Sequence, residues 1–481
     1  MASPITRRHL LRQAAALAAT SLVRGSMAQS RQPTLTVSHD STYTVPLDFT
    51  GLSYEKAQLA NPAFFSHRNH ALVALFRALS PQGVLRLGGG SSEFATYVAQ
   101  APDASVPFEV FGPDTSKTTK HGTLTTDAAL TALRGFLDAT GWSCLYGLNL
   151  GQGTAENAAD EAEAVTRLLG PRLIALQIGN EPDSFRKRYR PATYTPADFL
   201  AEWEHMHRVI RARVPAARFA GPDISNKLDY FLAFAAAAPQ WHDVTLLTSH
   251  AYAMGPAGSP NSTLANLLLP NPKLQTLSDD KLTQVLAASA NAHLPYRLCE
   301  ANSCWDGGKP GVSDTLASSL WCADYMLHLA TRGVSGINLH GGGNGYYTPI
   351  AGSPSLGFTR RPEYFGIQFA QQFAGSQCIP CSLDTTPPLL RAYVFRTTHG
   401  LQAAVINLSD EDASIRLAAD VRVSRHARSL RGGALDSTVP PSWTSLRAST
   451  DTLLPVPARS ASVYQLHRKP DRHARRSIEP L

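Results

Sequence analysis

The chain has 481 residues, of which 43% are hydrophobic and 17% charged, so it can form a sizeable core and global disorder is not expected. The net charge of +7 comes from the two ends: residues 1–28 carry four arginines and no acid, and residues 467–481 carry a net charge of +3. The body between them is neutral, which excludes a basic nucleic-acid-binding surface as the default interpretation. This length suits a large barrel with an accessory domain.

Residues 1–28 have the pattern of a bacterial export signal. Arg7 and Arg8 precede the weakly apolar stretch QAAALAATSLV, and Ser26-Met27-Ala28 offers small residues for cleavage. Twin arginines before a weak apolar segment are typical of the Tat route, which carries folded proteins. We therefore expect a periplasmic or secreted protein of a bacterium. No later stretch approaches the roughly 18 apolar residues of a membrane span, so no span is expected in the mature chain.

Strand-like and helix-like stretches alternate between residues 48 and 374. Eight near-continuously apolar stretches predict strands covered on both faces. They lie at 49–55, 83–91, 143–151, 173–181, 218–223, 244–252, 295–303 and 333–342. Amphipathic stretches between them, such as TTDAALTALRGFLDAT, predict helices. Eight such units predict a (β/α)₈ TIM barrel over 48–374, with an open doubly wound sheet as the alternative.

The pattern changes after residue 374. The stretches LLRAYVFRTT, LQAAVINLS, ASIRLAADV and ARSASVYQLH alternate with period two and are separated by turn residues. This predicts a C-terminal antiparallel β-sandwich domain over 375–468. The strand-like segment at 29–47 precedes the barrel and is expected to join the sandwich, because it would otherwise be unpaired. Residues 469–481 are expected to form a basic, disordered tail.

Polar or charged side chains end many of the predicted strands, where the functional groups of a barrel gather. They are Glu55, Arg86, Asn149, Glu181, Asp223, His250, Tyr252, Glu300 and His340. Glu181 ends the fourth strand and Glu300 the seventh, and these strands face each other across an eight-stranded barrel. Two carboxyl groups in one cleft suit glycosidic hydrolysis: one protonates the leaving oxygen, and the other attacks the anomeric carbon or activates water. The alternative for either residue alone is a salt bridge or a loop anchor.

An ordered set of motifs narrows this interpretation. The motifs are GLSYEKAQL, VLRLGGGSSEF, YGLNLG, LQIGNEPD, FAGPD, SHAY, EANSCWDGG and INLHGGGNGYYTPI. Over roughly residues 33–468 the chain resembles glycoside hydrolase family 79, the bacterial β-glucuronidases and heparanase-like enzymes, within the clan of retaining (β/α)₈ glycosidases. The resemblance implies an exo-β-glucuronidase that removes terminal β-linked glucuronic acid, or its 4-O-methyl form, by double displacement.

The resemblance also implies roles for matched residues. Glu181 would be the acid/base and Glu300 the nucleophile. Asn180 would hydrogen-bond the sugar 2-hydroxyl, Tyr252 would touch the nucleophile, and Glu55 would contact the sugar.

Two further positions would hold the sugar carboxylate. One is Tyr347, with Tyr346 as the alternative, and the other is Trp305 in CWDGG. The family is expected to carry tyrosine at the second position. An indole N–H donates one hydrogen bond but accepts none, so this substitution bears on carboxylate recognition.

The implied enzyme needs no cofactor and no metal, and His205 and His207 have no third ligand in view. Its expected partner is a carbohydrate that contains uronic acid, of proteoglycan or plant-glycoside type. Two other functions stay open: a heparanase-like endo-glycosidase or another glycosidase of the clan, and a catalytically inactive carbohydrate-binding protein. Oligomeric state does not follow from the sequence.

Overall fold

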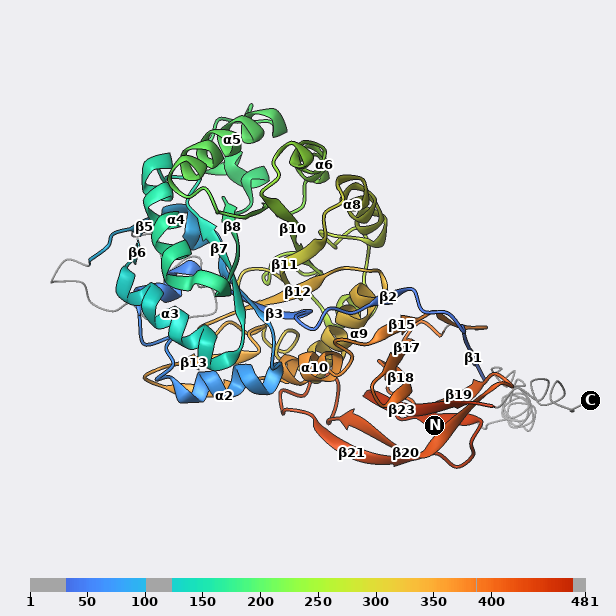
Figure 1. The fold of residues 1–481 in the computed structure, drawn as a ribbon. Coiled ribbons are helices and arrows are strands. Elements are labelled where there is room, and N and C mark those ends of the chain that lie inside the picture. Colours follow the sequence, from blue (N-terminus) through green and yellow to red (C-terminus); the bar gives the residue numbers. More distant parts are fainter. Residues whose placement is uncertain (1–31, 101–122, 386, 470–481) are drawn as a thin grey trace, which may run out of the picture.

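A closed barrel of eight parallel strands forms the larger part of the molecule (Figure 1). A computed structural model describes residues 32–100, 123–385 and 387–469. The barrel strands are β3 (Thr50–Glu55), β4 (Val84–Gly88), β7 (Ser143–Leu148), β8 (Leu173–Ile178), β9 (Phe219–Ile224), β10 (Val244–Tyr252), β11 (Tyr296–Asn302) and β12 (Gly336–Gly341). All eight predicted strands are present. The predicted TIM barrel is confirmed, and the open doubly wound sheet is wrong.

A helix follows each barrel strand and covers the outside of the barrel. These helices are α2 (His70–Leu79), α3 (Asp127–Thr140), α4 (Ala155–Leu169), α5 (Pro196–Arg213), α6 (Leu228–Ala237), α8 (Asp279–Ala292), α9 (Leu316–Thr331) and α10 (Pro362–Gln371). Helix α3 illustrates their origin. The side chain of Thr126 caps its first turn, Leu130, Leu133 and Leu137 are buried, and Gly141 ends it in the left-handed conformation.

The barrel interior changes character along its axis. An apolar cluster fills its lower part, made of Val84, Leu145, Ala175, Ala220, Leu246 and Cys299. Toward the carboxyl ends of the strands, the buried side chains become polar, as Arg86 and Gln177 show. The longer loops leave from this end. They carry two short two-stranded sheets and helix α7 (Leu264–Leu268). One sheet pairs β5 (Thr96–Tyr97) with β6 (Leu124–Thr125) in parallel, and the other pairs β13 (Ile350–Ser353) with β14 (Gly357–Arg360) in antiparallel fashion.

Two sheets form the β-sandwich. The seven-stranded sheet has the order β2 (Tyr43–Thr44), β15 (Gln377–Ile379), β17 (Leu390–Thr397), β18 (Gly400–Asn407), β23 (Ser460–Arg468), β20 (Val421–Arg431) and β21 (Ser442–Arg447). The four-stranded sheet has the order β16 (Cys381–Leu383), β1 (Thr34–Val37), β19 (Ala413–Leu417) and β22 (Leu453–Val456). Strands β1 and β2 come from the N-terminal segment and pair with C-terminal strands. A separate apolar core lies between the two sheets.

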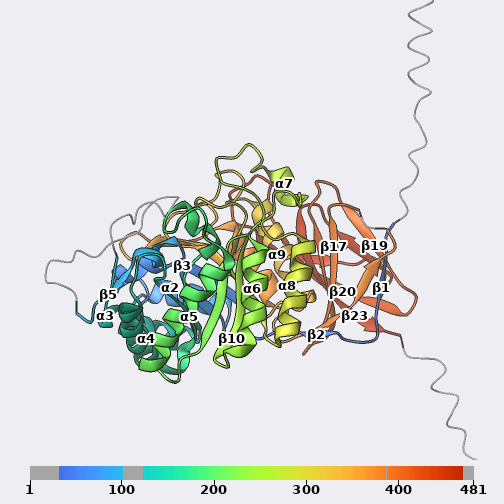
Figure 2. The same ribbon diagram turned by 90° about the horizontal axis from the view of Figure 1, so that it is seen from above.

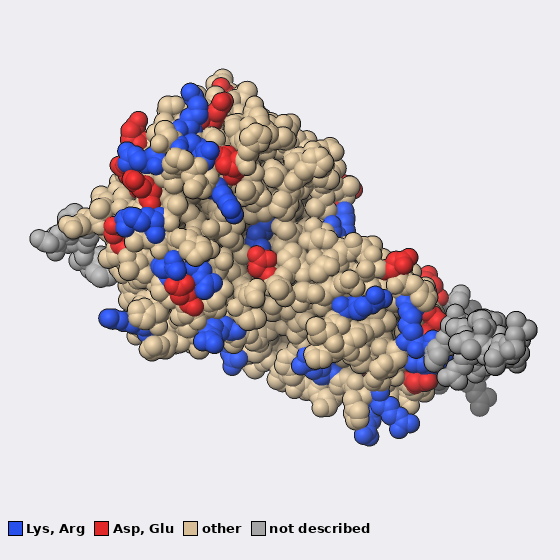
Figure 3. Space-filling model, in the orientation of Figure 1, with Lys and Arg blue, Asp and Glu red and all other residues tan. Residues whose placement is uncertain are grey.

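The sandwich lies beside the barrel, against α9 (Figure 2). The rings of Phe373, which follows α10, and Phe395 in β17 stack at 4.6 Å. The Tyr393 hydroxyl donates to Asp324 Oδ1 on α9 at 2.6 Å. One apolar cluster therefore runs from the barrel into the outer face of the seven-stranded sheet. On the face in Figure 3, basic and acidic side chains are interspersed over the barrel helices.

Some sequence predictions fall outside the described residues. The export signal at 1–28 lies there, as does the tail at 469–481 apart from Lys469. Export therefore stays a prediction. Among the helices of the described residues, none is both long and apolar enough to cross a membrane. All six cysteines are described, and all are free thiols.

The contact between barrel and sandwich can be tested with Phe395→Ala. Because this ring is fully buried, we expect its removal to lower the free energy of unfolding by about 3–5 kcal/mol, measured by urea denaturation. Leu356→Ala is the control, since this side chain is 70% exposed and its loss should change stability by less than about 0.5 kcal/mol. Equal effects of the two variants would contradict the packing described above.

Candidate active site

A pocket of about 320 Å³ opens at the carboxyl end of the barrel. The loops and strand ends that border it come from most of the βα units. All seven residues proposed from the sequence line it: Glu55, Asn180, Glu181, Tyr252, Glu300, Trp305 and Tyr347. Tyr346, the alternative to Tyr347, does not. The structure thus brings the predicted residues into one site.

Glu300 lies near the end of β11, with its side chain 8% exposed. The Tyr252 hydroxyl donates to its Oε1 at 2.8 Å, and Arg86 Nη1 donates to its Oε2 at 2.6 Å. Burial by itself raises the pKa of this carboxyl group. Three basic neighbours outweigh burial and hold the pKa well below its usual range; in order of effect they are His340, His250 and Arg86. The group is therefore ionised at neutral pH.

Glu181 lies in the turn that follows β8. Its φ of 54° is left-handed, an unusual conformation for a residue with a side chain. Its carboxyl group is 31% exposed, and Oε1 lies 3.0 Å from His250 Nδ1. Burial raises the pKa of Glu181, the charge of Glu300 raises it further, and His250 opposes both without cancelling them. The two carboxyl groups are thus shifted in opposite directions.

The two carboxyl groups lie close together. An oxygen of Glu181, an oxygen of Glu300 and a ring nitrogen of His250 all lie within 4.8 Å of one another. A proton donor and an ionised carboxylate therefore face the same space above the barrel.

Arg86, fully buried in β4, supports both sides of this pair. Besides Glu300, its guanidinium donates to Asn180 Oδ1 at 2.7 Å and to Asp223 Oδ2 at 2.5 Å. Because arginine can only donate, it fixes the orientation of the Asn180 amide, whose NH₂ group is left for the pocket. The backbone N–H of Glu181 donates to the carbonyl of Asp223 at 2.9 Å.

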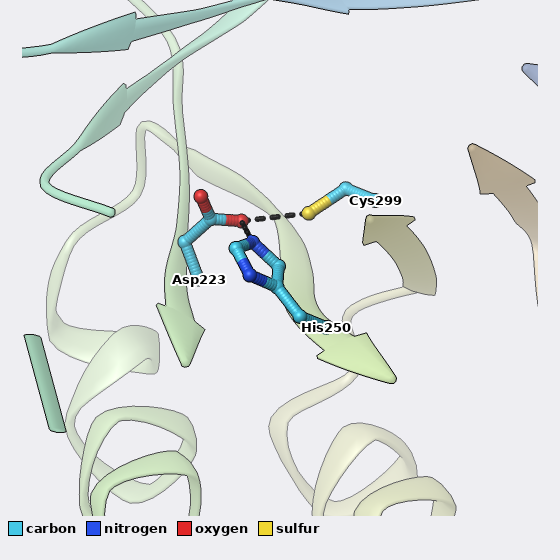
Figure 4. Close-up of side chains that lie close together, drawn as sticks. All are labelled: Asp223, His250 and Cys299. Carbon is cyan, nitrogen blue, oxygen red and sulfur yellow. Dashed lines mark hydrogen bonds and ion pairs between the residues drawn. The ribbon is translucent and has the colours of Figure 1, made fainter. Parts of the chain in front are cut away.

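Asp223, His250 and Cys299 form a buried cluster below the pocket (Figure 4). The thiol of Cys299 donates to Asp223 Oδ1 at 2.6 Å, and His250 Nε2 lies 3.2 Å from the same oxygen. This donor set could hold a metal ion. However, a divalent ion would lie next to the Arg86 guanidinium and next to His250, whose pKa is raised by Asp223 and Glu300 despite burial. We interpret the cluster as hydrogen-bonded support.

Glu55 lies in the pocket wall at the end of β3, with its Oε1 3.8 Å from His340 Nε2. Its Oε2 accepts hydrogen bonds from the backbone N–H of Ser91, at 2.8 Å, and from the Ser91 hydroxyl. The backbone of Gly89 passes so close that a Cβ there would lie 2.5 Å from the Glu55 carboxyl carbon. Gly89 also has a φ of 71°, so this turn requires glycine.

The two residues assigned to the sugar carboxylate differ in exposure. Tyr347 is buried, with its ring centroid 5.8 Å from that of His340 and 6.5 Å from that of Tyr252. Trp305 is 43% exposed, and its carbonyl accepts a hydrogen bond from Ala257 at 3.0 Å. Tyr347 therefore lies deep in the pocket beside the carboxylates, whereas Trp305 lies at its rim.

Comparison with known sequences identifies the class of protein. No family model matches the chain. The chain is 26% identical over 406 residues to a β-glucuronidase of Aspergillus niger, covering 75% of this chain and 69% of that protein. It is 25% identical over 378 residues to a β-glucuronidase of Neurospora crassa, covering 72% and 66%. The chain thus spans about two thirds of the length of these relatives.

These similarities support a glycoside hydrolase of β-glucuronidase-like type. Solved structures agree with the fold of the enzyme. A 4-O-α-L-rhamnosyl-β-D-glucuronidase from Fusarium oxysporum 12S matches with a TM-score of 0.72 at 18% identity, covering 90% of this chain and all of that one. A family 51 arabinofuranosidase from Xanthomonas axonopodis pv. citri matches with a TM-score of 0.66 at 14% identity, covering 91% and 100%.

Several pocket residues of the enzyme were not predicted. Glu93 is one of them; it is almost fully buried and lies in the short 3₁₀ segment η2 (Gly90–Phe94) after β4. The motif GGGSSEF that contains it was noted only as part of the resemblance. The outer rim comes from loops whose positions have no periodic signal; its residues include Lys187, Arg188, Ser225, Asn226 and Thr276.

Because Arg86 forms ion pairs with Asp223 and Glu300, we expect its contribution to the stability of the enzyme to depend on pH. Arg86→Met leaves Asp223 and Glu300 buried without their cation, so the free energy of unfolding should fall by about 3–5 kcal/mol at pH 7. The pKa values of both carboxyl groups are lowered in the folded enzyme. These two ionised groups therefore stabilise the fold fully at a pH above the pKa values that they have in the unfolded chain, roughly 4. This contribution to the free energy of unfolding is lost as the pH falls. The deficit of the variant should shrink between pH 7 and pH 3 in urea unfolding.

Arg425→Met is the matched control. Arg425 is an exposed arginine of β20, and its replacement should change stability by less than about 0.5 kcal/mol at either pH. A deficit of Arg86→Met that is constant or larger at pH 3 would contradict the assignment.

Proposed function

We propose that the enzyme is a retaining exo-β-glucuronidase, which removes terminal β-linked glucuronic acid or its 4-O-methyl form. The observation that carries the proposal is the pair Glu181 and Glu300, with oxygens within 4.8 Å and pKa values shifted in opposite directions. Retaining glycosidases hold their two carboxyl groups roughly 5–5.5 Å apart, whereas inverting ones leave roughly 6.5–9.5 Å for a water molecule. The short separation supports double displacement.

In the first step, ionised Glu300 attacks the anomeric carbon while Glu181 donates its proton to the glycosidic oxygen. The bond from the anomeric carbon to that oxygen breaks, the leaving group departs as an alcohol, and an ester forms between Glu300 and the sugar. Arg86 and the Tyr252 hydroxyl hold the two Glu300 oxygens in place for this attack. The NH₂ group of Asn180 is oriented to donate to the sugar 2-hydroxyl.

In the second step, Glu181 acts as the base. Once the ester has formed, Glu300 carries no charge, and the repulsion that raised the pKa of Glu181 is gone. His250 remains beside Glu181 and favours its ionised form. Glu181 then takes a proton from water while the water oxygen attacks the anomeric carbon. The ester bond to Glu300 breaks, and the sugar leaves with its original anomeric configuration.

Recognition of the sugar carboxylate is assigned to Tyr347 and Trp305. Both line the same pocket as the catalytic pair, and both can donate a hydrogen bond. The names of the two curated relatives support glucuronic acid as the sugar. A glycan or glycoside that contains uronic acid would be the natural substrate, met in the periplasm or outside the cell if residues 1–28 direct export.

A panel of nitrophenyl glycosides tests the sugar. If Tyr347 and Trp305 bind a carboxylate, the β-glucuronide should be hydrolysed with a kcat/KM at least about 10²-fold above that of the β-glucoside or β-xyloside, since the latter leave polar groups of the site unpaired. A glucoside preference would refute this assignment. An oligosaccharide with internal and terminal glucuronic acid distinguishes exo from endo action. The first product is a single sugar in the exo case and an oligosaccharide fragment in the endo case.

Substitution of the two carboxylic acids tests the mechanism. Glu300→Ala should lower kcat by about 10⁴-fold or more on every substrate, because no ester can form. Glu181→Gln should lower kcat/KM by about 10²–10⁴-fold for phenyl β-glucuronide, whose leaving group needs a proton. In the same variant, the rate at which the dinitrophenyl glycoside forms the ester with Glu300 should be nearly unchanged. This rate is measured as a burst of dinitrophenol. If the protein were an inactive carbohydrate-binding protein, the unsubstituted chain would already show no turnover.

A further inference from the structure

Glu93 joins the ends of three neighbouring barrel strands. Its side chain leaves η2, after β4, and the residue is 1% exposed. One carboxylate oxygen, Oε2, accepts the backbone N–H of Gly151, in the loop after β7. The other, Oε1, accepts the backbone N–H of Asn180, in the turn after β8. Both oxygens of one side chain are therefore occupied by backbone donors from two different loops.

We propose that Glu93 is a positioning residue that fixes the backbone at Asn180, next to Glu181, and so directs the proton of Glu181 at the glycosidic oxygen. The backbone here is held at two successive residues. Glu93 binds the N–H of Asn180, and the carbonyl of Asp223 binds the N–H of Glu181. Directly after the second anchor the chain takes the left-handed conformation of Glu181, whose side chain borders the pocket. This inference rests on the proposed role of Glu181.

The charge of Glu93 has no ion-pair partner among the described residues. Lys56 lies nearby, but its amino group is bound to Glu161 at 2.8 Å and to the carbonyl of Gly147 at 3.0 Å. Arg190 is paired with Glu202 at 2.8 Å. A buried carboxylate without a cation is costly, and burial raises the pKa of Glu93 to about 7 although its two backbone hydrogen bonds lower it.

This cost argues against a purely structural role. A glutamine would fill the same space without charge, but its NH₂ group would take the place of one oxygen, so one of the two backbone N–H groups would face a donor. A carboxylate offers an accepting oxygen to each loop. Glu93 also borders the pocket, together with Asn180 and Glu181, so its hydrogen bonds to the two loops lie beside the reacting groups. Another titratable neighbour is Tyr189, whose pKa is raised first by burial and then by Glu93.

Glu93→Gln tests the proposal with two readouts. The first is kcat/KM for phenyl and for 2,4-dinitrophenyl β-glucuronide. A misdirected proton donor should cost about 10²-fold on the phenyl substrate and less than about threefold on the dinitrophenyl substrate, which needs no proton. The second is amide hydrogen exchange of a peptide that covers residues 173–185. The N–H groups of Asn180 and Glu181 should exchange at least tenfold faster than in the unsubstituted enzyme.

Asp324→Asn is the control, because Asp324 is a half-buried carboxylate bound to Tyr393 at the contact between barrel and sandwich. It should slow both substrates equally if it slows them at all. Equal losses on the two substrates in Glu93→Gln, or unchanged exchange at 180–181, would overturn the proposal. If Glu93→Gln does not fold, Glu93→Asp gives the same readouts, since its shorter side chain cannot span both donors.

Failure of the proposed function has a separate signature. In that case the unsubstituted enzyme would not hydrolyse the dinitrophenyl β-glucuronide, or Glu181→Gln would slow phenyl and dinitrophenyl substrates alike. Glu93 would then have no proton donor to position, whereas a negative result confined to Glu93→Gln leaves the function of Glu181 intact.

Discussion

The buried guanidinium of Arg86 is the interaction on which the rest of the site depends. It binds Glu300, Asp223 and Asn180 at once, and each of these leads to a different part of the pocket. Three polar groups from three strands can converge only where a cation with several fixed donors lies between them. Such a cation is tolerated inside the barrel because all five of its guanidinium N–H groups have acceptors. The apolar floor below it keeps water from the cluster and keeps these contacts strong.

The same charges give the two carboxyl groups different protonation states. Glu300 lies next to Arg86 and close to two histidines, whereas Glu181 faces Glu300 and a single histidine. The difference does not arise from the residue type, since both are glutamates. It arises from the strand on which each glutamate lies and from the side chains on adjacent strands. The barrel therefore shifts the pKa values of two side chains of one kind in opposite directions, and the proposed double displacement depends on this difference.

The sequence was informative wherever periodicity or position on a strand carried the signal. All eight strands were predicted because each is an apolar run followed by turn residues and a helix, and Glu181 and Glu300 followed from their places at strand ends. Arg86, Asp223 and His250 were recognised as strand-end groups, but their mutual contacts depend on side-chain directions that no periodicity encodes. Glu93 was missed because its partners are backbone N–H groups of two loops. Trp305 was placed in the pocket correctly, but its exposure follows from loop packing against residues 256–257.

The pairing of the N-terminal strand β1 with C-terminal strands limits how early the β-sandwich can form during synthesis. Residues 34–37 pair with residues 381–383 and 416–417, which are synthesised more than 340 residues later. At roughly 5–20 residues per second, the strand waits on the order of 20–70 s for its partners. Its four residues limit mispairing during this delay, because so short an edge offers few hydrogen bonds to another chain. The sandwich thus closes only after β16 and β19 have been made, later than all eight strands of the barrel.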